Sequence, residues 1–284
     1  MRKCSYILEG SMGRRLALDV FDTIGSPRAT VLYMHGFGGF KDWGDNDYLA
    51  QRWVAAGVRY IRFNFSLNGT TPEYPTEFVD LDGFAANNYT HMLYDVGQVL
   101  SFIGKHETMR KAAEVNEVPI ILVGHSMGGT VALLAAAEYP TVAAAISWAA
   151  PAACKTPWER WPAWQLKTWR ELGVQYYLNS RTRQQLPIAY QLYQDFEANA
   201  ARFDLQKRLA DCKKPLLMMY GLADTSVPAS AAQLLAGYAS NARLWLGDGD
   251  HTFNRRHPSA AFGTTPAMAA VLAASLEFID SITS

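Results

Sequence analysis

A serine stands between glycines in the segment Gly124–Gly129, which reads GHSMGG. The segment follows the apolar run Ile120–Val123 and precedes a helix-like stretch that starts at Met127. A G-x-S-x-G sequence between a strand and a helix is typical of a sharp turn that exposes a strained serine, with glycines where side chains would collide. The helix start behind Ser126 also offers unpaired N–H groups to a developing negative charge. The context therefore predicts a nucleophile rather than an inert serine.

A serine hydroxyl is a weak nucleophile until a base removes its proton, and after such a turn the base is expected last in the chain. Two histidines lie late enough, His251 and His257. His251 belongs to a glycine-rich loop that follows the strand-like run Ala242–Leu246, whereas His257 lies in the polar sequence RRHP, which suggests a solvated loop. We predict that His251 is the general base.

The acid that orients the base is expected on the loop after the preceding strand. Asp224 is the only carboxylate in Gly221–Pro228, which follows the predicted strand Pro215–Tyr220. A carboxylate there would hold the imidazole tautomer and stabilise the imidazolium. Asp248 and Asp250 are alternatives, but both lie so close to His251 in the chain that a role within the loop is the better interpretation.

A second glycine-rich loop, His35–Gly39 (HGFGG), follows the predicted strand Ala29–Met34. We expect the backbone N–H groups of Phe37 and Met127 to form an oxyanion hole. The side chain of His35 is interpreted as a brace for this loop. For His125 two interpretations stay open, a hydrogen-bonded residue of the serine turn, which we prefer, or a pocket wall.

Short apolar runs alternate with segments of helical length around these motifs. The remaining expected strands are Arg15–Phe21, Val58–Phe65, Pro119–Val123 and Ala143–Trp148. The expected helices are Asp47–Ala56, Asn88–Lys105, Met127–Glu138, Ala229–Ala239 and Thr265–Ile279. Strands that are apolar on both faces and alternate with helices predict an α/β fold whose mostly parallel sheet is covered on both sides. The polar-alternating N-terminal strands suit an antiparallel edge.

Residues 152–212 contain no convincing strand and carry eight Trp and Tyr residues between two predicted core strands. We predict an α/β core of residues 1–151 and 213–284 with a helical cap insertion, residues 152–212, over the carboxyl edge of the sheet, where ligands bind in open parallel sheets. The aromatic residues would shape an apolar pocket or, equally, pack the insertion onto the core.

Composition excludes several other classes. The 26 basic residues balance 26 acidic ones, and no basic stripe indicates nucleic acid or an anionic membrane. The segment Met1–Glu9 is too polar for a signal peptide, no apolar run approaches membrane-spanning length, and three scattered cysteines suit free thiols, which together predict a cytoplasmic protein. No metal-ligand spacing and no nucleotide-binding loop is present, so we expect neither a metal nor a cofactor.

In these motifs and their order the chain resembles the α/β-hydrolase superfamily over almost its whole length, and most closely the carboxylesterase-type members related to cinnamoyl or feruloyl esterases, serine aminopeptidases and dienelactone hydrolases. The resemblance implies an eight-stranded, mostly parallel sheet, a helical cap and hydrolysis through an acyl-enzyme. One departure follows the strand Tyr60–Phe63, where many relatives carry Asp and a Gly-x-Gly-x-Ser turn and this chain has Asn64–Thr70 (NFSLNGT).

The resulting hypothesis is an enzyme, a serine hydrolase of carboxylic esters (EC 3.1.1) with an apolar or aromatic part, whose partner is a small-molecule ester. Aminopeptidase or amidase action is an alternative that needs an acid to hold an ammonium group. Acids of the insertion could supply it: Glu159, Glu171, Asp195 and Glu197. Thioester hydrolysis is also open. A non-catalytic ligand-binding relative is a weaker hypothesis, because all three candidate catalytic residues are present.

Overall fold

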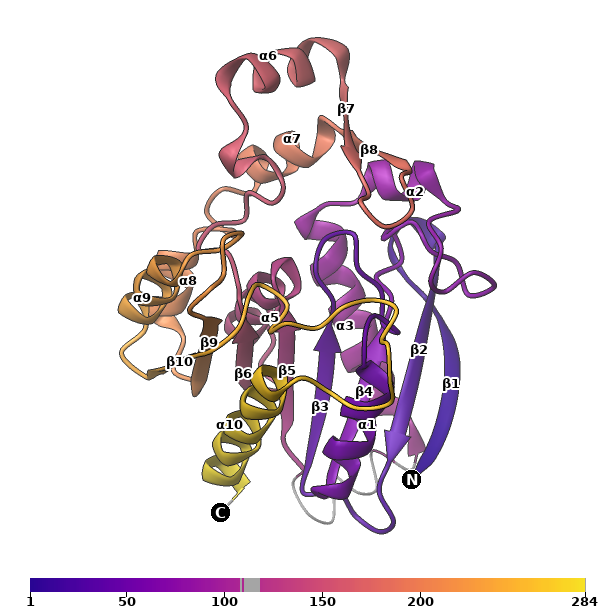
Figure 1. The fold of residues 1–284 in the computed structure, drawn as a ribbon, viewed down its shortest axis with the longest axis vertical. Coiled ribbons are helices and arrows are strands. Elements are labelled where there is room, and N and C mark those ends of the chain that lie inside the picture. The colour runs from indigo at the N-terminus through magenta and orange to yellow at the C-terminus, as the bar shows by residue number, and fades with distance from the viewer. Residues whose placement is uncertain (108, 110–117, 284) are drawn as a thin grey trace.

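The computed structural model describes residues 1–107, 109 and 118–283, and within them eight strands form one sheet in the order β1-β2-β4-β3-β5-β6-β9-β10 (Figure 1). β1 pairs antiparallel with β2 and β2 with β4, while the other neighbours are parallel. The strands are β1 Arg2–Glu9, β2 Arg15–Asp22, β3 Ala29–Met34, β4 Val58–Phe63, β5 Ile120–His125, β6 Val142–Trp148, β9 Leu216–Gly221 and β10 Ala242–Gly247. The mostly parallel eight-stranded sheet is confirmed.

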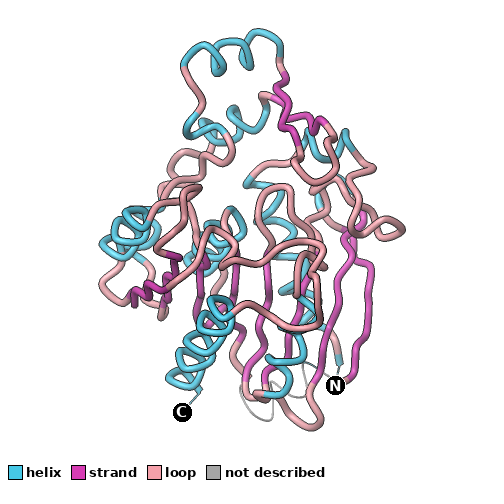
Figure 2. The backbone as a smooth tube through the Cα atoms, in the orientation of Figure 1, coloured by secondary structure: helices cyan, strands magenta, loops and turns pink. Residues whose placement is uncertain are grey.

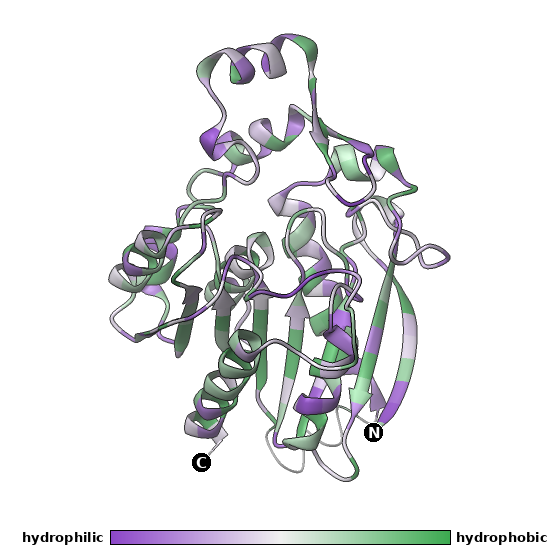
Figure 3. Ribbon diagram, in the orientation of Figure 1, coloured by the Kyte–Doolittle hydropathy of each residue, from purple (hydrophilic) through white to green (hydrophobic). Residues whose placement is uncertain are grey.

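Helices cover both faces of this sheet and bury two apolar cores. On one face α1 (Asn46–Ala55) and α10 (Pro266–Thr283) pack with their apolar sides on the strands. On the other face lie α3 (Tyr89–Lys105), α5 (Met127–Glu138), α8 (Leu205–Asp211) and α9 (Ala229–Tyr238). The central strands are coloured mainly hydrophobic in Figure 3, as strands buried on both sides must be.

Within the described part of the chain, α10 alone is long and apolar enough to cross a membrane by length and composition. The sequence led us to expect no segment of this kind. In the structure Met268, Val271 and Ile279 of α10 are fully buried against the sheet, so this helix forms part of the protein core.

Residues 152–204 of the insertion, called the cap from here on, contain α6 (Ala163–Leu172), α7 (Gln191–Ala198) and two strands, β7 (Val174–Leu178) and β8 (Gln185–Ala189). The last helix of the insertion, α8, packs on α5 and α9 of the core instead. The expectation of an insertion without strands is therefore wrong, since β7 and β8 pair as an antiparallel hairpin. Figures 1 and 2 show the hairpin and α6 standing over the carboxyl ends of the parallel strands.

Most aromatic residues of the cap contact one another rather than a pocket. Trp169 is fully buried, its indole N–H donates to the carbonyl oxygen of Ile188 at 2.7 Å, and Trp158 packs against it at 5.8 Å between ring centroids. Trp161 and Tyr190 pack on the same ring at 5.1 and 5.3 Å. The aromatic residues thus mainly form the interior of the cap.

Candidate active site

Ser126 occupies the sharp turn between β5 and α5, with φ 54° and ψ −124°. This conformation is rare for residues other than glycine and marks stored strain. The glycines on either side leave the room it needs. A Cβ on Gly124 would lie 2.0 Å from the carbonyl oxygen of Gly128, and a Cβ on Gly128 would lie 2.4 Å from that of His35. Any larger residue at these two positions would force the turn apart.

The structure brings the three predicted catalytic side chains together. His251 Nε2 lies 2.9 Å from Ser126 Oγ, and His251 Nδ1 lies 2.7 Å from Asp224 Oδ2. Ser126 follows β5, Asp224 lies on the loop after β9, and His251 lies on the loop after β10. Because these strands are parallel, their carboxyl ends meet at one edge of the sheet, and residues 125 positions apart become neighbours.

The side chain of Asp224 is wholly buried and fixed in orientation. Its Oδ1 accepts the backbone N–H groups of Ser226 and Val227, both at 2.8 Å, which leaves Oδ2 for the imidazole. A carboxylate in this position keeps the proton of a neutral His251 on Nδ1, so that Nε2 is free to accept a proton from Ser126.

Asp250, the alternative acid, organises its own loop instead. Its Oδ1 accepts the backbone N–H groups of Thr252 and Asn254, and its Oδ2 pairs with Arg256 at 2.9 Å. Burial alone would raise its pKa, but the hydrogen bonds from Asn254, Arg256 and Thr252 outweigh burial and lower the pKa to about 2. Asp248, the other alternative, is exposed.

The loop His35–Gly39 passes directly over the nucleophile. A Cβ on Gly36 would lie 3.1 Å from the Cβ of Ser126, which shows how closely the two backbones approach. Among the described residues, no backbone or side-chain acceptor binds the N–H of Phe37 or of Met127. The absence of an acceptor for these two groups is what the oxyanion-hole hypothesis requires.

His35 braces this loop from below. Its Nδ1 donates to the carbonyl oxygen of Gly36 at 2.9 Å, while Nε2 accepts from the backbone N–H of Phe65 at 3.4 Å and the amide of Asn68 at 3.3 Å. Burial lowers the pKa of His35 to about 4, so the ring is neutral at physiological pH. Asn68 also donates to the carbonyl oxygen of Gly39 at 3.2 Å. The segment Asn64–Thr70, whose sequence differs from that of many relatives, therefore supports the loop.

His125 combines both roles considered for it. Its Nε2 donates to the carbonyl oxygen of His251 at 2.7 Å, which ties the serine turn to the loop of the predicted base. The same side chain lines the cavity in front of Ser126. Burial, followed by the charge of His251, lowers the pKa of His125, so its ring is a neutral donor.

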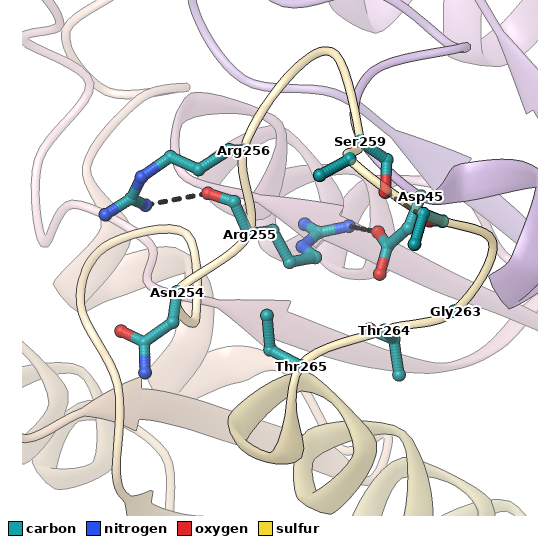
Figure 4. A pocket seen from close by; sticks show the side chains of 10 residues that line it. Asp45, Asn254, Arg255, Arg256, Ser259, Gly263, Thr264 and Thr265 are labelled. Atoms are coloured by element: carbon teal, nitrogen blue, oxygen red, sulfur yellow. Dashed lines mark hydrogen bonds and ion pairs between the residues drawn. The ribbon is translucent and has the colours of Figure 1, made fainter.

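The loop after His251 is anchored to the core by a buried ion pair. Arg255 Nη1 donates to Asp45 Oδ1 at 3.0 Å, and Figure 4 shows this contact in a cavity bounded by the loop that leads into α10.

The interpretation of His257 as a solvated residue is wrong. Its ring stacks on Trp43 at 6.1 Å between centroids, and its Nδ1 accepts the backbone N–H of Gly44 at 2.9 Å.

Two adjoining cavities open onto the candidate site. The smaller, about 150 Å³, is lined by Ser126, His251 and the loop His35–Gly39. The larger, about 540 Å³, shares five wall residues with it, Phe37, Gly38, Trp43, His251 and Thr252, and extends to the turn between β7 and β8. Of the eight Trp and Tyr residues of the cap, only Tyr177 lines either of these two cavities, and its ring packs on Phe37 at 5.1 Å between centroids.

The acids of the cap that could hold an ammonium group lie elsewhere. Asp195 binds the hydroxyl of Thr90, Glu171 pairs with Lys167 in solvent, and Glu159 lines a separate cavity. None of the four candidate acids lines either of the two cavities described above. Within the described residues, no group of three or more His, Cys, Asp or Glu side chains could hold a metal ion.

The strand order, a strained serine after β5 and an Asp–His pair on the loops after β9 and β10 define a member of the α/β-hydrolase superfamily. The profile of the family described as "Serine aminopeptidase, S33" matches residues 25–202, more than half of the chain. The chain belongs to this family. Asp224 and His251 lie outside the matched residues, so their assignment rests on the geometry given above.

Solved structures of similar fold include several hydrolases. A putative hydrolase from Agrobacterium vitis S4 is 19% identical with a TM-score of 0.72, covering 98% of this chain and 100% of the other. Est1E from Butyrivibrio proteoclasticus is 16% identical with a TM-score of 0.69, covering 98% of each chain. A monoglyceride lipase variant from Saccharomyces cerevisiae is 14% identical with a TM-score of 0.69, covering 100% of this chain and 96% of the other. Comparison with functionally curated proteins finds no significant match.

Proposed function

We propose that this protein is a serine hydrolase that cleaves carboxylic esters of small molecules through an acyl-enzyme intermediate. The observation that carries the proposal is the continuous chain of hydrogen bonds from Ser126 Oγ through His251 to Asp224, at 2.9 and 2.7 Å. These hydrogen bonds end at Ser126, which lines the smaller cavity together with Phe37. The backbone N–H groups of Phe37 and of Met127, the residue after Ser126, have no acceptor among the described residues, which suits the binding of a carbonyl oxygen under attack.

In the proposed reaction Ser126 Oγ attacks the ester carbonyl carbon while its proton passes to His251 Nε2. The N–H groups of Phe37 and Met127 bind the oxyanion, and such a donor commonly contributes about 3–4 kcal/mol. The intermediate collapses, the C–O bond to the alcohol breaks, and the alcohol takes the proton from Nε2. Water then attacks the acyl-serine with His251 again as base, which releases the carboxylic acid and restores Ser126.

The position of the acidic residues favours ester over aminopeptidase action. A free N-terminal ammonium needs a carboxylate near the nucleophile, and the candidate acids of the cap line neither cavity at Ser126. No carboxylate of the described residues lines the smaller cavity, whose wall includes the aromatic rings of Phe37 and Trp43. The carboxylate of Asp250 lines the larger cavity, but it is paired with Arg256 at 2.9 Å. We also propose a cytoplasmic location, supported by the absence of a disulfide among the three cysteines, Cys4, Cys154 and Cys212.

The direct test uses the hydrolysis of p-nitrophenyl butyrate by the purified protein and by Ser126→Ala. We expect the variant to lose about 10⁴- to 10⁶-fold in kcat, as removal of a nucleophilic serine does in related triads. Ser240→Ala, an exposed serine between α9 and β10, is the matched control and is expected to keep the wild-type rate.

A fluorophosphonate probe gives an independent reading. We expect it to label the wild type at Ser126 and to leave Ser126→Ala unlabelled, because only an activated serine reacts. Turnover that survives in Ser126→Ala, or absence of both turnover and labelling in the wild type, would show that the protein is not this kind of enzyme and would leave the non-catalytic, ligand-binding alternative.

A further inference from the structure

We propose that the larger cavity beside Ser126 is a subsite for an anionic group, so that the preferred esters carry a carboxylate held by Arg181. This inference rests on the proposed ester hydrolysis and names the substrate class of the same site. The sequence alone predicts an ester with an apolar or aromatic part, and the structure adds an anionic group to this substrate class.

Arg181 reaches the cavity from the turn of the β7–β8 hairpin in the cap. It lines the same cavity as His251 and Phe37, which belong to the catalytic arrangement. Two contacts hold its guanidinium in place, a hydrogen bond from Nη2 to the carbonyl oxygen of Thr76 at 3.3 Å and a position over the ring of Phe40 at 5.5 Å from the centroid. Arg181 therefore contributes a positive charge to the wall of this cavity.

The charges around this cavity do not cancel. Arg256 also lines it, but Asp250 Oδ2 lies 2.9 Å from Arg256 Nη1, and this pair is neutral as a unit. Among the described residues no carboxylate forms an ion pair with Arg181. Among the described residues that line this cavity, Arg181 is thus a cation without an ion-pair partner, and its charge attracts an anionic group on a bound molecule.

His257 adds a hydrogen-bond donor to the same cavity. Its Nδ1 accepts the N–H of Gly44, so the neutral ring carries its proton on Nε2. Asn179, Ser180 and Thr225 contribute further polar side chains to the lining. A carboxylate, which accepts several hydrogen bonds and carries one negative charge, fits this set of groups better than an apolar chain does.

The subsite can serve either half of the ester, so the experiment contains one pair of substrates for each. The acyl pair is the p-nitrophenyl monoester of adipic acid and its methyl ester, which differ only in the terminal carboxylate. The leaving-group pair is 4-nitro-3-butanoyloxybenzoate and its methyl ester. For each pair the measured quantity is the ratio of kcat/KM for the anionic member to that for the neutral member, at low salt because screening weakens such contacts.

We expect the wild type to prefer the anionic member of at least one pair, and the preferred pair identifies the half of the ester that enters the cavity. Arg181→Gln is expected to lower that ratio about tenfold, equivalent to about 1.4 kcal/mol, and Arg181→Glu to lower it further. Arg183→Gln is the matched control, because Arg183 lies on the same exposed turn but does not line the cavity. It is expected to keep the wild-type ratio.

A binding experiment separates this proposal from the hydrolase proposal. Calorimetric titration of Ser126→Ala with the intact anionic ester is expected to give about tenfold tighter binding than titration of Ser126→Ala/Arg181→Gln. If the wild type hydrolyses neutral esters but shows no anionic preference in either pair, the subsite is refuted and the hydrolase stands. If no ester is turned over, equal binding by the two variants refutes the subsite as well, whereas tighter binding that depends on Arg181 supports it.

Discussion

Replacing Asp224 with asparagine is expected to lower kcat for ester hydrolysis by about 10⁴-fold, about 5.5 kcal/mol in activation free energy, without loss of the fold. The reason lies in the hydrogen bonds around the side chain. The N–H groups of Ser226 and Val227 both point at Oδ1, so the amide oxygen of an asparagine would take that position and its NH₂ group would face His251 Nδ1. Nδ1 would then have to accept, which moves the ring proton to Nε2.

A proton on Nε2 faces Ser126 Oγ and prevents His251 from acting as a base. The amide cannot easily turn over, because its NH₂ would then meet two N–H donors, and each unsatisfied donor costs about 1–3 kcal/mol. The assay is the kcat for p-nitrophenyl butyrate, together with the melting temperature of each protein. Asp248→Asn, an exposed carboxylate three positions before His251, is the control and should match the wild type. If Asp224→Asn kept activity within tenfold, the assigned tautomer and the role of Asp224 would be wrong.

Two further predictions concern stability. Gly128→Ala is expected to destabilise the protein by at least about 1–3 kcal/mol in urea unfolding, because its Cβ would lie 2.4 Å from the carbonyl oxygen of His35. Gly104→Ala is the control, since Gly104 has open space around it in α3, and it should gain about 0.5–1 kcal/mol in stability. Equal effects of the two substitutions would contradict the packing described at the turn. His35, whose pKa falls from 6.5 to about 4 on burial, binds its proton less readily in the folded protein than in the unfolded chain. The contribution of His35 to the free energy of unfolding should therefore decrease by roughly 3 kcal/mol as pH falls from 6.5 to 4. His35→Gln should remove this part of the pH dependence. If the free energy of unfolding depended on pH in the same way in the wild type and the variant, the prediction would be wrong.

The core and the candidate site follow from local patterns in the sequence. β5 and α5 are apolar almost throughout, and the glycines between them have one evident use, the turn that carries Ser126. Asp224 and His251 could be located because each lies on a short loop directly after a strand, Asp224 after the buried strand β9 and His251 after the edge strand β10. Parallel strands align such loops at one edge, so strand order alone brings the residues together.

The missed features depend on contacts that no local pattern records. The sequence does not predict β1, because alternation in a polar segment of eight residues is a weak signal. β8 contains Pro187, which argues against a strand, although Val174–Leu178 before it has the aromatic and branched residues of one. His257 stands in a polar sequence, and its partners Phe40 and Gly44 lie more than 200 positions away.

The placement of the acid and base after β9 and β10 has a consequence for how activity is lost. β10 is an edge strand, and side chains such as Leu244 and Leu246 are exposed on it, whereas the turn that carries Ser126 lies in the middle of the sheet. Local unfolding is easiest where few buried contacts hold the backbone, and an edge strand has a hydrogen-bonded neighbour on one side only. Local unfolding of β10 would move His251 away from Ser126 while the residues around Ser126 are still folded. Ester hydrolysis should therefore be lost at a lower temperature or denaturant concentration than the secondary structure of the core.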